Sequence, residues 1–184
     1  YNLFTNVPLE VMKADIWRYM VLYKYGGVYA DIDTICNKSI KSWVDDKYDL
    51  IVSDDGDGQS FCQLTFAANK NHVILKTVLD YIFAKLQKTD YDNINFVHNT
   101  TGVVIWSKAI RDVLKFKPQD PFFFYNAFNV SKNAQHYKFF CFKGEKSNIF
   151  YDGAVTHISG SINHWDDSYI KWQDEAKRFL KNDS

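Results

Sequence analysis

Residues 8–33 constrain the fold more than any other part of the sequence. Apolar side chains recur at helical spacing from residue 8 to residue 25, Gly26 and Gly27 follow, and an apolar stretch then ends in Asp31 and Asp33. Proline at position 8 suits the first turn of a helix, and glycine accepts the left-handed backbone that closes one. The segment therefore predicts a helix over 8–25 followed at once by a short strand and a turn over 28–33.

The rest of the chain alternates between strand and helix patterns. Strands are expected at 48–53, 61–67, 122–125, 137–142 and 154–158, and helices at 72–88, 101–114 (capped by Thr100 or Thr101) and 168–180. Alternation through the first two thirds favours an α/β sandwich with a mostly parallel sheet. With 184 residues and no repeat or linker, one domain is expected.

Composition excludes several classes of protein. Lysine plus arginine and aspartate plus glutamate number 22 each, so the net charge is zero and a nucleic-acid partner is not expected. A content of 46% hydrophobic and 24% charged residues is typical of a globular protein. No apolar run is long enough to span a bilayer. The sequence does not decide between the Golgi lumen and the cytoplasm.

The acidic stretch at the end of the first strand is the strongest functional signal. Alternation along a strand would turn Ile32 toward the core and place Tyr29, Asp31 and Asp33 on the other face, near the carboxyl end where open α/β sheets bind ligands. Two neighbouring carboxylates repel each other unless a cation lies between them, and oxygen ligands suit Mg²⁺ or Mn²⁺. A short Asp-x-Asp also occurs by chance in solvated turns, so its flanks matter.

The preceding helix carries a second charged pair. Asp15 and Arg18 lie one helical turn apart and share a face. Taken alone they form an ordinary surface ion pair, which contributes little to stability. Their position just before the glycines and the acidic strand suggests instead that they point into the same site as Asp31 and Asp33.

The segment 14–33, ADIWRYMVLYKYGGVYADID, resembles the signature of the DXD-containing glycosyltransferase family 32, which includes yeast mannosyltransferases. This region is also similar to the glucosylating clostridial toxins. The resemblance implies a GT-A fold, a Rossmann-like αβα sandwich with a mixed, mostly parallel sheet. It further implies transfer of a hexose, with retention of configuration, from a UDP- or GDP-sugar to a glycan, lipid or protein acceptor, with Mn²⁺ or Mg²⁺ as the cofactor.

The same resemblance assigns roles to residues of the signature. It implies that Asp15 and Arg18 contact the donor sugar, that Tyr29 packs near the donor, and that Asp31 and Asp33 hold the metal. Asp15, Arg18 and Asp33 are therefore the expected catalytic residues, and Asp31 is expected to bind the donor as well.

Two later segments resemble the family more loosely. Residues 99–103 resemble a Thr-Gly-Pro turn before a helix, with Val103 in place of proline. Residues 154–162 resemble a pattern in which histidine precedes Gly-Ser-Trp, with Ile162 in place of tryptophan. The alignment favours His157 as a further ligand of the metal, and His164 remains the alternative.

Family members carry an earlier strand and helix that form part of the nucleotide-base pocket. Residues 1–184 are therefore expected to be a single catalytic domain that lacks this segment, or one that holds the base in a reduced way. The acidic loop 54–57 is expected to be a solvated turn, with a place beside the acceptor as the alternative.

Two other functions remain open. Residues 31–34, DIDT, fit the nucleophile loop of haloacid-dehalogenase-type phosphatases, in which Asp31 would be phosphorylated and Asp33 would lie beside Mg²⁺. That interpretation leaves Arg18 unexplained. A non-catalytic carbohydrate-binding module, with the aromatic residues at 122–128 stacking on sugars, is the other alternative.

Overall fold

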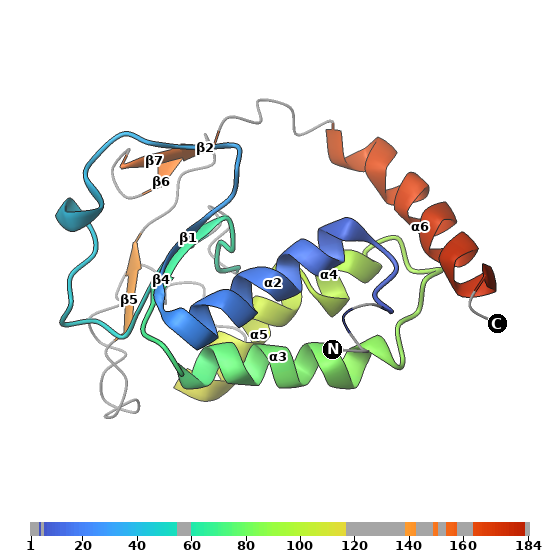
Figure 1. Cartoon of the computed structure of the whole chain (residues 1–184), viewed down its shortest axis with the longest axis horizontal. Helices are drawn as coiled ribbons and strands as arrows, with labels where there is room; N and C mark the ends of the chain where they lie inside the picture. The colour runs from blue at the N-terminus through green and yellow to red at the C-terminus, as the bar shows by residue number, and fades with distance from the viewer. Residues whose placement is uncertain are drawn as a thin grey trace.

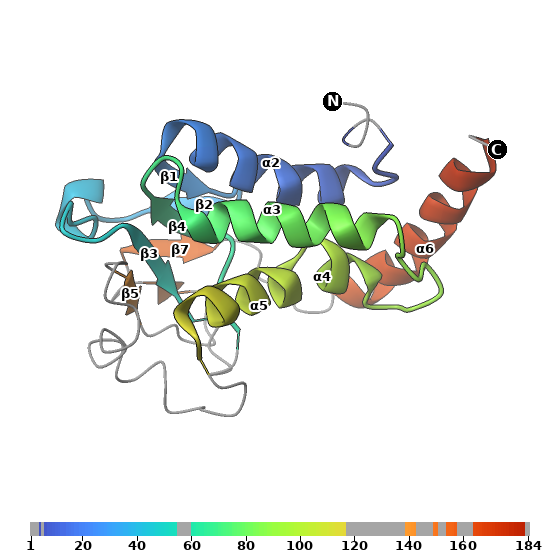
Figure 2. The same ribbon diagram turned by 90° about the horizontal axis from the view of Figure 1, so that it is seen from below.

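The structure is a computed structural model that describes residue 4 and residues 6–54, 60–116, 139–142, 149–150, 154–157 and 164–182. Its helices form one layer, and α6 lies at the end of that layer away from the strands (Figure 1; Figure 2). In chain order the elements are α2 (Glu10–Tyr25), β1 (Gly27–Ala30), β2 (Thr34–Cys36), η1 (Ile40–Ser42), β3 (Leu50–Ser53), β4 (Thr65–Ala68), α3 (Val73–Leu86), α4 (Phe96–Thr100), α5 (Val103–Leu114), β5 (Phe139–Phe142), β6 (Ile149–Phe150), β7 (Val155–His157) and α6 (His164–Asn182).

The strands form two sheets, ordered β1-β4-β3-β5 and β2-β7-β6. Only β3 and β5 pair in parallel, whereas the other four pairings of the described strands are antiparallel. The prediction of a mostly parallel sheet is therefore wrong for these strands, although the mixed α/β class is confirmed. The physical reason is that no helix separates β3 from β4, and strands joined without a crossover pair antiparallel.

The carboxyl ends of three strands nevertheless lie at the same end of the larger sheet. Both β1 and β3 run antiparallel to β4, which lies between them, and β5 runs parallel to β3. It follows that β1, β3 and β5 share one direction. Asp31 follows β1 and Asp54 follows β3 at this end of the sheet. Ligand binding was predicted from the sequence at the carboxyl ends of the strands.

The two faces of the larger sheet pack against different parts of the chain. Leu50 and Val52 of β3 join a large core cluster to which every α-helix of the described residues contributes, whereas Ile51 joins a smaller cluster on the opposite face. This alternation is what the pleat of a strand imposes. The smaller cluster is built by Trp43, Ile51, Cys62, Ala67, Ala154 and Val155. Within the described ranges no α-helix covers that face, so the third layer of the expected αβα sandwich is not seen there.

The junction between α2 and β1 explains why glycine stands at position 26. Gly26 has a φ of 69° and its N–H donates to the carbonyl of Leu22, which closes the helix. A Cβ at this position would lie 2.8 Å from the backbone nitrogen of Lys70. The sharp reversal that starts β1 therefore requires both the left-handed backbone and the missing side chain. The helix and strand predicted around Gly26 are confirmed.

Other predicted elements are confirmed with shifted bounds. The helix expected at 101–114 is α5, whose N-cap is Gly102 with no side-chain cap, so the predicted threonine cap is wrong. The short helix α4 before it was not predicted, and the strand expected at 122–125 lies outside the described residues. Among the described helices none is long and apolar enough to cross a membrane.

Candidate functional site

Asp31 and Asp33 lie in a tight turn that joins the two sheets rather than on a strand. β1 ends at Ala30, and the carbonyl of Asp31 accepts hydrogen bonds from the Thr34 hydroxyl (2.6 Å) and the Thr34 N–H (3.1 Å). Ile32, at the tip, is fully exposed. The prediction that Ile32 faces the core is therefore wrong, because the strand alternation stops two residues earlier.

Asp31 points back toward the helical layer. Its Oδ1 accepts a 2.6 Å hydrogen bond from the Tyr29 hydroxyl and lies 3.3 Å from Nη1 of Arg18. The guanidinium of Arg18 also lies over the Tyr29 ring, 4.8 Å from its centroid. Tyr29 and Arg18 thus hold the Asp31 carboxylate by contacts from the strand and from the helix.

Asp15 and Arg18 form a buried ion pair at the floor of this cluster. Nη2 of Arg18 lies 3.0 Å from Oδ1 of Asp15, and the two residues are 5% and 2% exposed. Asp15 also accepts hydrogen bonds from the Gln63 amide (3.1 Å) and the Thr101 hydroxyl (2.8 Å). The alternative of a surface ion pair is therefore excluded, and the prediction that this pair faces the same site as Asp31 is confirmed.

Burial shifts the proton affinities of this cluster. Burial raises the pKa of Asp15 to about 6, although the charge of Arg18 and the hydrogen bonds from Thr101 and Gln63 act to lower it. Burial disfavours the charge of Arg18, but the carboxylates of Asp15 and Asp31 outweigh this effect and raise its pKa. Nε of Arg18 is buried and has no hydrogen-bond partner among the described residues.

Asp33 meets His157 on the outer side of the turn. The β2–β7 register pairs Thr34 with His157, which brings the imidazole beside residue 33. Nε2 of His157 lies 3.0 Å from Oδ2 of Asp33. The Asp33 side chain is 45% exposed and that of His157 12%. The expected proximity of His157 to Asp33 is confirmed.

The structure thus divides the three predicted metal ligands between two places. Asp33 and His157 lie together, whereas Asp31 lies with Arg18 and Tyr29. Within the described ranges no group of three or more His, Cys, Asp or Glu side chains could hold a metal ion. His164 is the first residue of α6, and its side chain lies outside the described part of the structure.

Sequence reasoning missed Gln63 and Tyr19. The Gln63 side chain lies between Asp15 and the Tyr19 hydroxyl, which donates to its Oε1 at 2.8 Å. The available signal was a lone amide in the apolar run 61–68, FCQLTFAA. Thr101 was expected as a helix cap and as part of the Thr-Gly turn at 99–103, but no contact with Asp15 was predicted, and its hydroxyl donates to that carboxylate.

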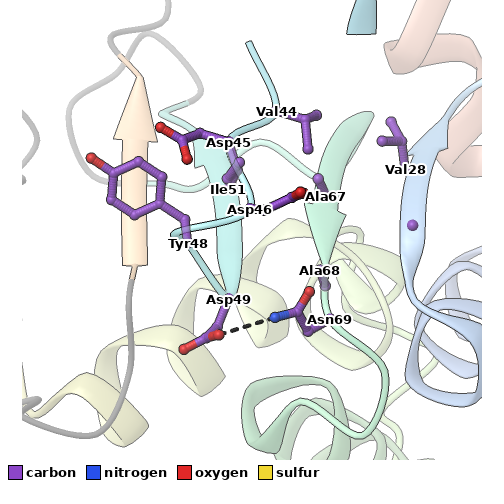
Figure 3. Close-up of a pocket in the computed structure, with 11 residues that line it drawn as sticks. Val28, Val44, Asp45, Asp46, Tyr48, Asp49, Ile51, Ala67, Ala68 and Asn69 are labelled. Carbon is purple, nitrogen blue, oxygen red and sulfur yellow. Dashed lines mark hydrogen bonds between the residues drawn. The ribbon is translucent and has the colours of Figure 1, made fainter. Parts of the chain in front are cut away.

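A separate cavity lies at the opposite end of the larger sheet. It encloses about 130 Å³ beside the start of β1, where Gly27 pairs with Ala68, whereas the acidic turn follows the far end of that strand. Figure 3 shows Asp49 joined to Asn69 by a hydrogen bond (3.0 Å) at this cavity. Its lining contains none of the predicted site residues.

Only the first residue of the acidic loop after β3 can be placed. Asp54 is 2% exposed and forms an antiparallel bridge with Phe61, so it is not part of a solvated turn. Asp55 and Asp57 lie outside the described residues.

Comparison with known proteins gives consistent matches. Residues 1–49 match the family described as "Glycosyltransferase sugar-binding region containing DXD motif". The initiation-specific alpha-1,6-mannosyltransferase of Schizosaccharomyces pombe is 33% identical over 151 residues, which are 70% of this chain and 38% of that protein. The inositol phosphoceramide mannosyltransferase 3 of the same yeast is 43% identical over 37 residues, 20% of this chain and 10% of that protein.

A solved structure, the PaToxG glycosyltransferase, aligns with a TM-score of 0.44 and 14% identity over 90% of this chain and 51% of its own. The chain spans about two fifths of the first mannosyltransferase that it matches. The family match and the similar mannosyltransferases support neither the phosphatase nor the carbohydrate-binding alternative. The resemblance to the DXD glycosyltransferases is confirmed: residues 1–49 match the family of their sugar-binding region, and the chain is similar to the yeast α-1,6-mannosyltransferases.

Proposed function

We propose that this chain is a GT-A glycosyltransferase domain that transfers a hexose, with retention, from a nucleotide sugar to an acceptor. The observation that carries the proposal is the buried Asp15–Arg18–Asp31 cluster at the carboxyl end of β1, directly beside the Asp33–His157 pair. Mannose is the favoured hexose, because the similar yeast proteins are named mannosyltransferases. The acceptor is a glycan, a lipid or a protein, the three classes that the family resemblance implies.

The outer pair has the chemistry of a cation site. A half-exposed carboxylate and an imidazole 3.0 Å apart offer oxygen and nitrogen ligands of the kind that Mn²⁺ accepts. Asp31 is a poorer direct ligand, because Tyr29 and Arg18 already engage its oxygens. Asp33 and His157 would therefore hold the metal, and Asp31 would support the site from the same turn. When bound, the metal supplies positive charge that stabilises the departing diphosphate.

The inner cluster is suited to orient the donor sugar. The Asp15 carboxylate is contacted by three donor groups, those of Arg18, Gln63 and Thr101. A carboxylate can accept about four hydrogen bonds. One acceptor site of the Asp15 carboxylate is left for a sugar hydroxyl. A side chain that is already fixed orients a substrate without further loss of conformational entropy.

Donor hydrolysis and transfer test the proposal. The chain is incubated with GDP-mannose, UDP-glucose, UDP-galactose and UDP-N-acetylglucosamine, each in Mn²⁺ and in EDTA, with a mannose oligosaccharide as acceptor. Metal-dependent release of the nucleoside diphosphate, greatest with GDP-mannose, is expected. Release of inorganic phosphate from a phosphomonoester instead, or no turnover of any donor, would contradict the proposal.

A further inference from the structure

We propose that Gln63 is a positioning residue that fixes Asp15 and Arg18 in the orientation required to receive the donor sugar. The inference rests on the proposed function, because the sugar is the ligand that these two residues are proposed to hold. Gln63 contacts three residues of α2 through three different groups: its Nε2 faces Asp15, its Oε1 faces Tyr19 and its backbone carbonyl faces Arg18.

The backbone around Gln63 is held at three successive residues. The Phe61 N–H donates to the Ser107 hydroxyl (2.8 Å), and the Cys62 carbonyl accepts from the Trp106 indole (3.2 Å). The Gln63 carbonyl accepts from Nη1 of Arg18 at 2.8 Å. Helix α5 thus fixes the chain just before Gln63, and this fixed carbonyl in turn holds the guanidinium.

The Asp15 carboxylate and the Tyr19 hydroxyl together set the orientation of the Gln63 amide. The Tyr19 hydroxyl donates to Oε1 at 2.8 Å, so Nε2 is the end that donates to Asp15. The Tyr19 ring stacks on Trp106 with centroids 5.2 Å apart and is fully buried, which fixes the position of the hydroxyl. Burial also raises the pKa of Tyr19 well above its usual value, so the hydroxyl keeps the proton that it donates.

A reversed amide would disturb Asp15. Oε1 of Gln63 would then lie against Oδ1 of the Asp15 carboxylate, and two acceptors at that distance repel each other. The ordered amide instead gives Asp15 a donor that favours its charged form. Around the same carboxylate lie Arg18, which attracts it, and Asp31, whose charge opposes ionisation.

The experiment replaces the side chain and keeps the backbone contact to Arg18. Gln63→Met retains the length but has neither amide donor nor acceptor, and Gln63→Glu places an acceptor against Asp15. Gln173→Met is the matched control, since among the described residues the Gln173 amide on α6 donates to backbone carbonyls, those of Tyr91 and Asp92. We expect kcat/KM for the nucleotide sugar to fall about 10- to 100-fold in Gln63→Met, the size of one lost hydrogen bond to a charged group, and further in Gln63→Glu.

Two readouts separate positioning from a merely structural role. Affinity for the free nucleoside diphosphate should stay within about twofold of the original chain. Asp15 and Arg18 are proposed to contact the sugar, and this ligand has no sugar. The pKa of the Asp15 carboxyl, followed by carbon NMR, should rise in Gln63→Met, since a bond that favours its charged form is gone. Tyr19→Phe removes the hydroxyl that donates to the Gln63 amide and leaves Gln63 itself unchanged. It should lower kcat/KM and raise the Asp15 pKa, as Gln63→Met does, and it replaces Gln63→Met in the test if that variant does not fold.

Failure of the Gln63 proposal and failure of the proposed function would give different results. An unchanged kcat/KM and an unchanged Asp15 pKa in Gln63→Met would overturn the positioning role, as would equal losses in Gln173→Met. If the original chain turns over no donor, the proposed function fails. The pKa of Asp15 would then still decide whether Gln63 controls the state of that carboxyl.

Discussion

The two carboxylates of the acidic turn sit in opposite environments. Asp31 faces inward and is held by Tyr29 and Arg18, whereas Asp33 faces outward, is 45% exposed and contacts His157. The inner half is already ordered by the protein itself. Under the proposed function, the outer half would gain further partners from the metal and the donor. We therefore expect inner substitutions to cost both stability and activity, and outer substitutions to cost activity alone.

The largest effect is expected from Arg18→Met. This change leaves the carboxylates of Asp15 and Asp31 close together without a cation, and breaking a buried pair costs about 3–5 kcal/mol. Chemical denaturation should show that loss, and glycosyl transfer should disappear. Lys108→Met is the matched control, because Lys108 pairs with Asp112 at an exposed position, where about 0–1 kcal/mol is expected. Similar losses in the two variants would remove the distinction between buried and exposed pairs.

Asp33→Asn should abolish transfer and donor hydrolysis while the free energy of unfolding stays within about 0.5 kcal/mol of the original. Asparagine keeps the shape but loses the charge that a metal requires, and the exposed position bears little packing. Asp80→Asn, at another exposed aspartate, should change neither quantity. Full activity in Asp33→Asn, or equal activity in EDTA, would contradict the metal-binding role of the outer half.

His157→Ala should raise the Mn²⁺ concentration needed for half-maximal activity roughly tenfold or more, since even partners behind the metal ligands affect affinity by about that factor. Maximal activity at saturating metal should fall less. His164→Ala should leave the Mn²⁺ dependence unchanged. A metal requirement that shifts with His164 and not with His157 would reverse the assignment and leave the inner cluster unaffected.

The last prediction concerns pH. Burial raises the pKa of Asp15 from 3.8 to about 6, so the folded chain binds a proton that the unfolded chain releases between these values. Stability should therefore fall as pH rises from about 4 to about 6 and then level off. Asp15→Asn should lack this fall when denaturation curves at pH 4 and pH 7 are compared. Activity should move oppositely and decline below about pH 6, as Asp15 loses its charge.

Local features of the fold were predictable from the sequence. The helix, the Gly26 reversal and the strand after it follow from side-chain spacing and from the backbone freedom of glycine. The pairing of the strands was not predictable in this way, since it depends on β4 inserting between β1 and β3. Ile32 was misassigned for a related reason: alternation indicates a face but does not say where the strand ends.

Within the site, the sequence identified the charged residues of one short segment but not their hydrogen-bond partners. Asp15, Arg18 and Asp31 lie within 17 residues of each other in sequence, so a pattern could join them. Gln63 and Thr101 reach Asp15 from 48 and 86 positions away. His157 was expected from family resemblance, and the β2–β7 register is what brings it to Asp33. Contacts between residues so far apart in sequence depend on how the elements pack, and a local sequence pattern does not predict them.

The turn between Asp31 and Asp33 joins two sheets that meet through the small cluster of Trp43, Ile51, Cys62, Ala67, Ala154 and Val155. Asp31 is held by the helical layer and Asp33 by β7, so the relative position of the two sheets contributes to where the two carboxylates point. The volume of that cluster therefore acts on the geometry of the site without any contact to a ligand.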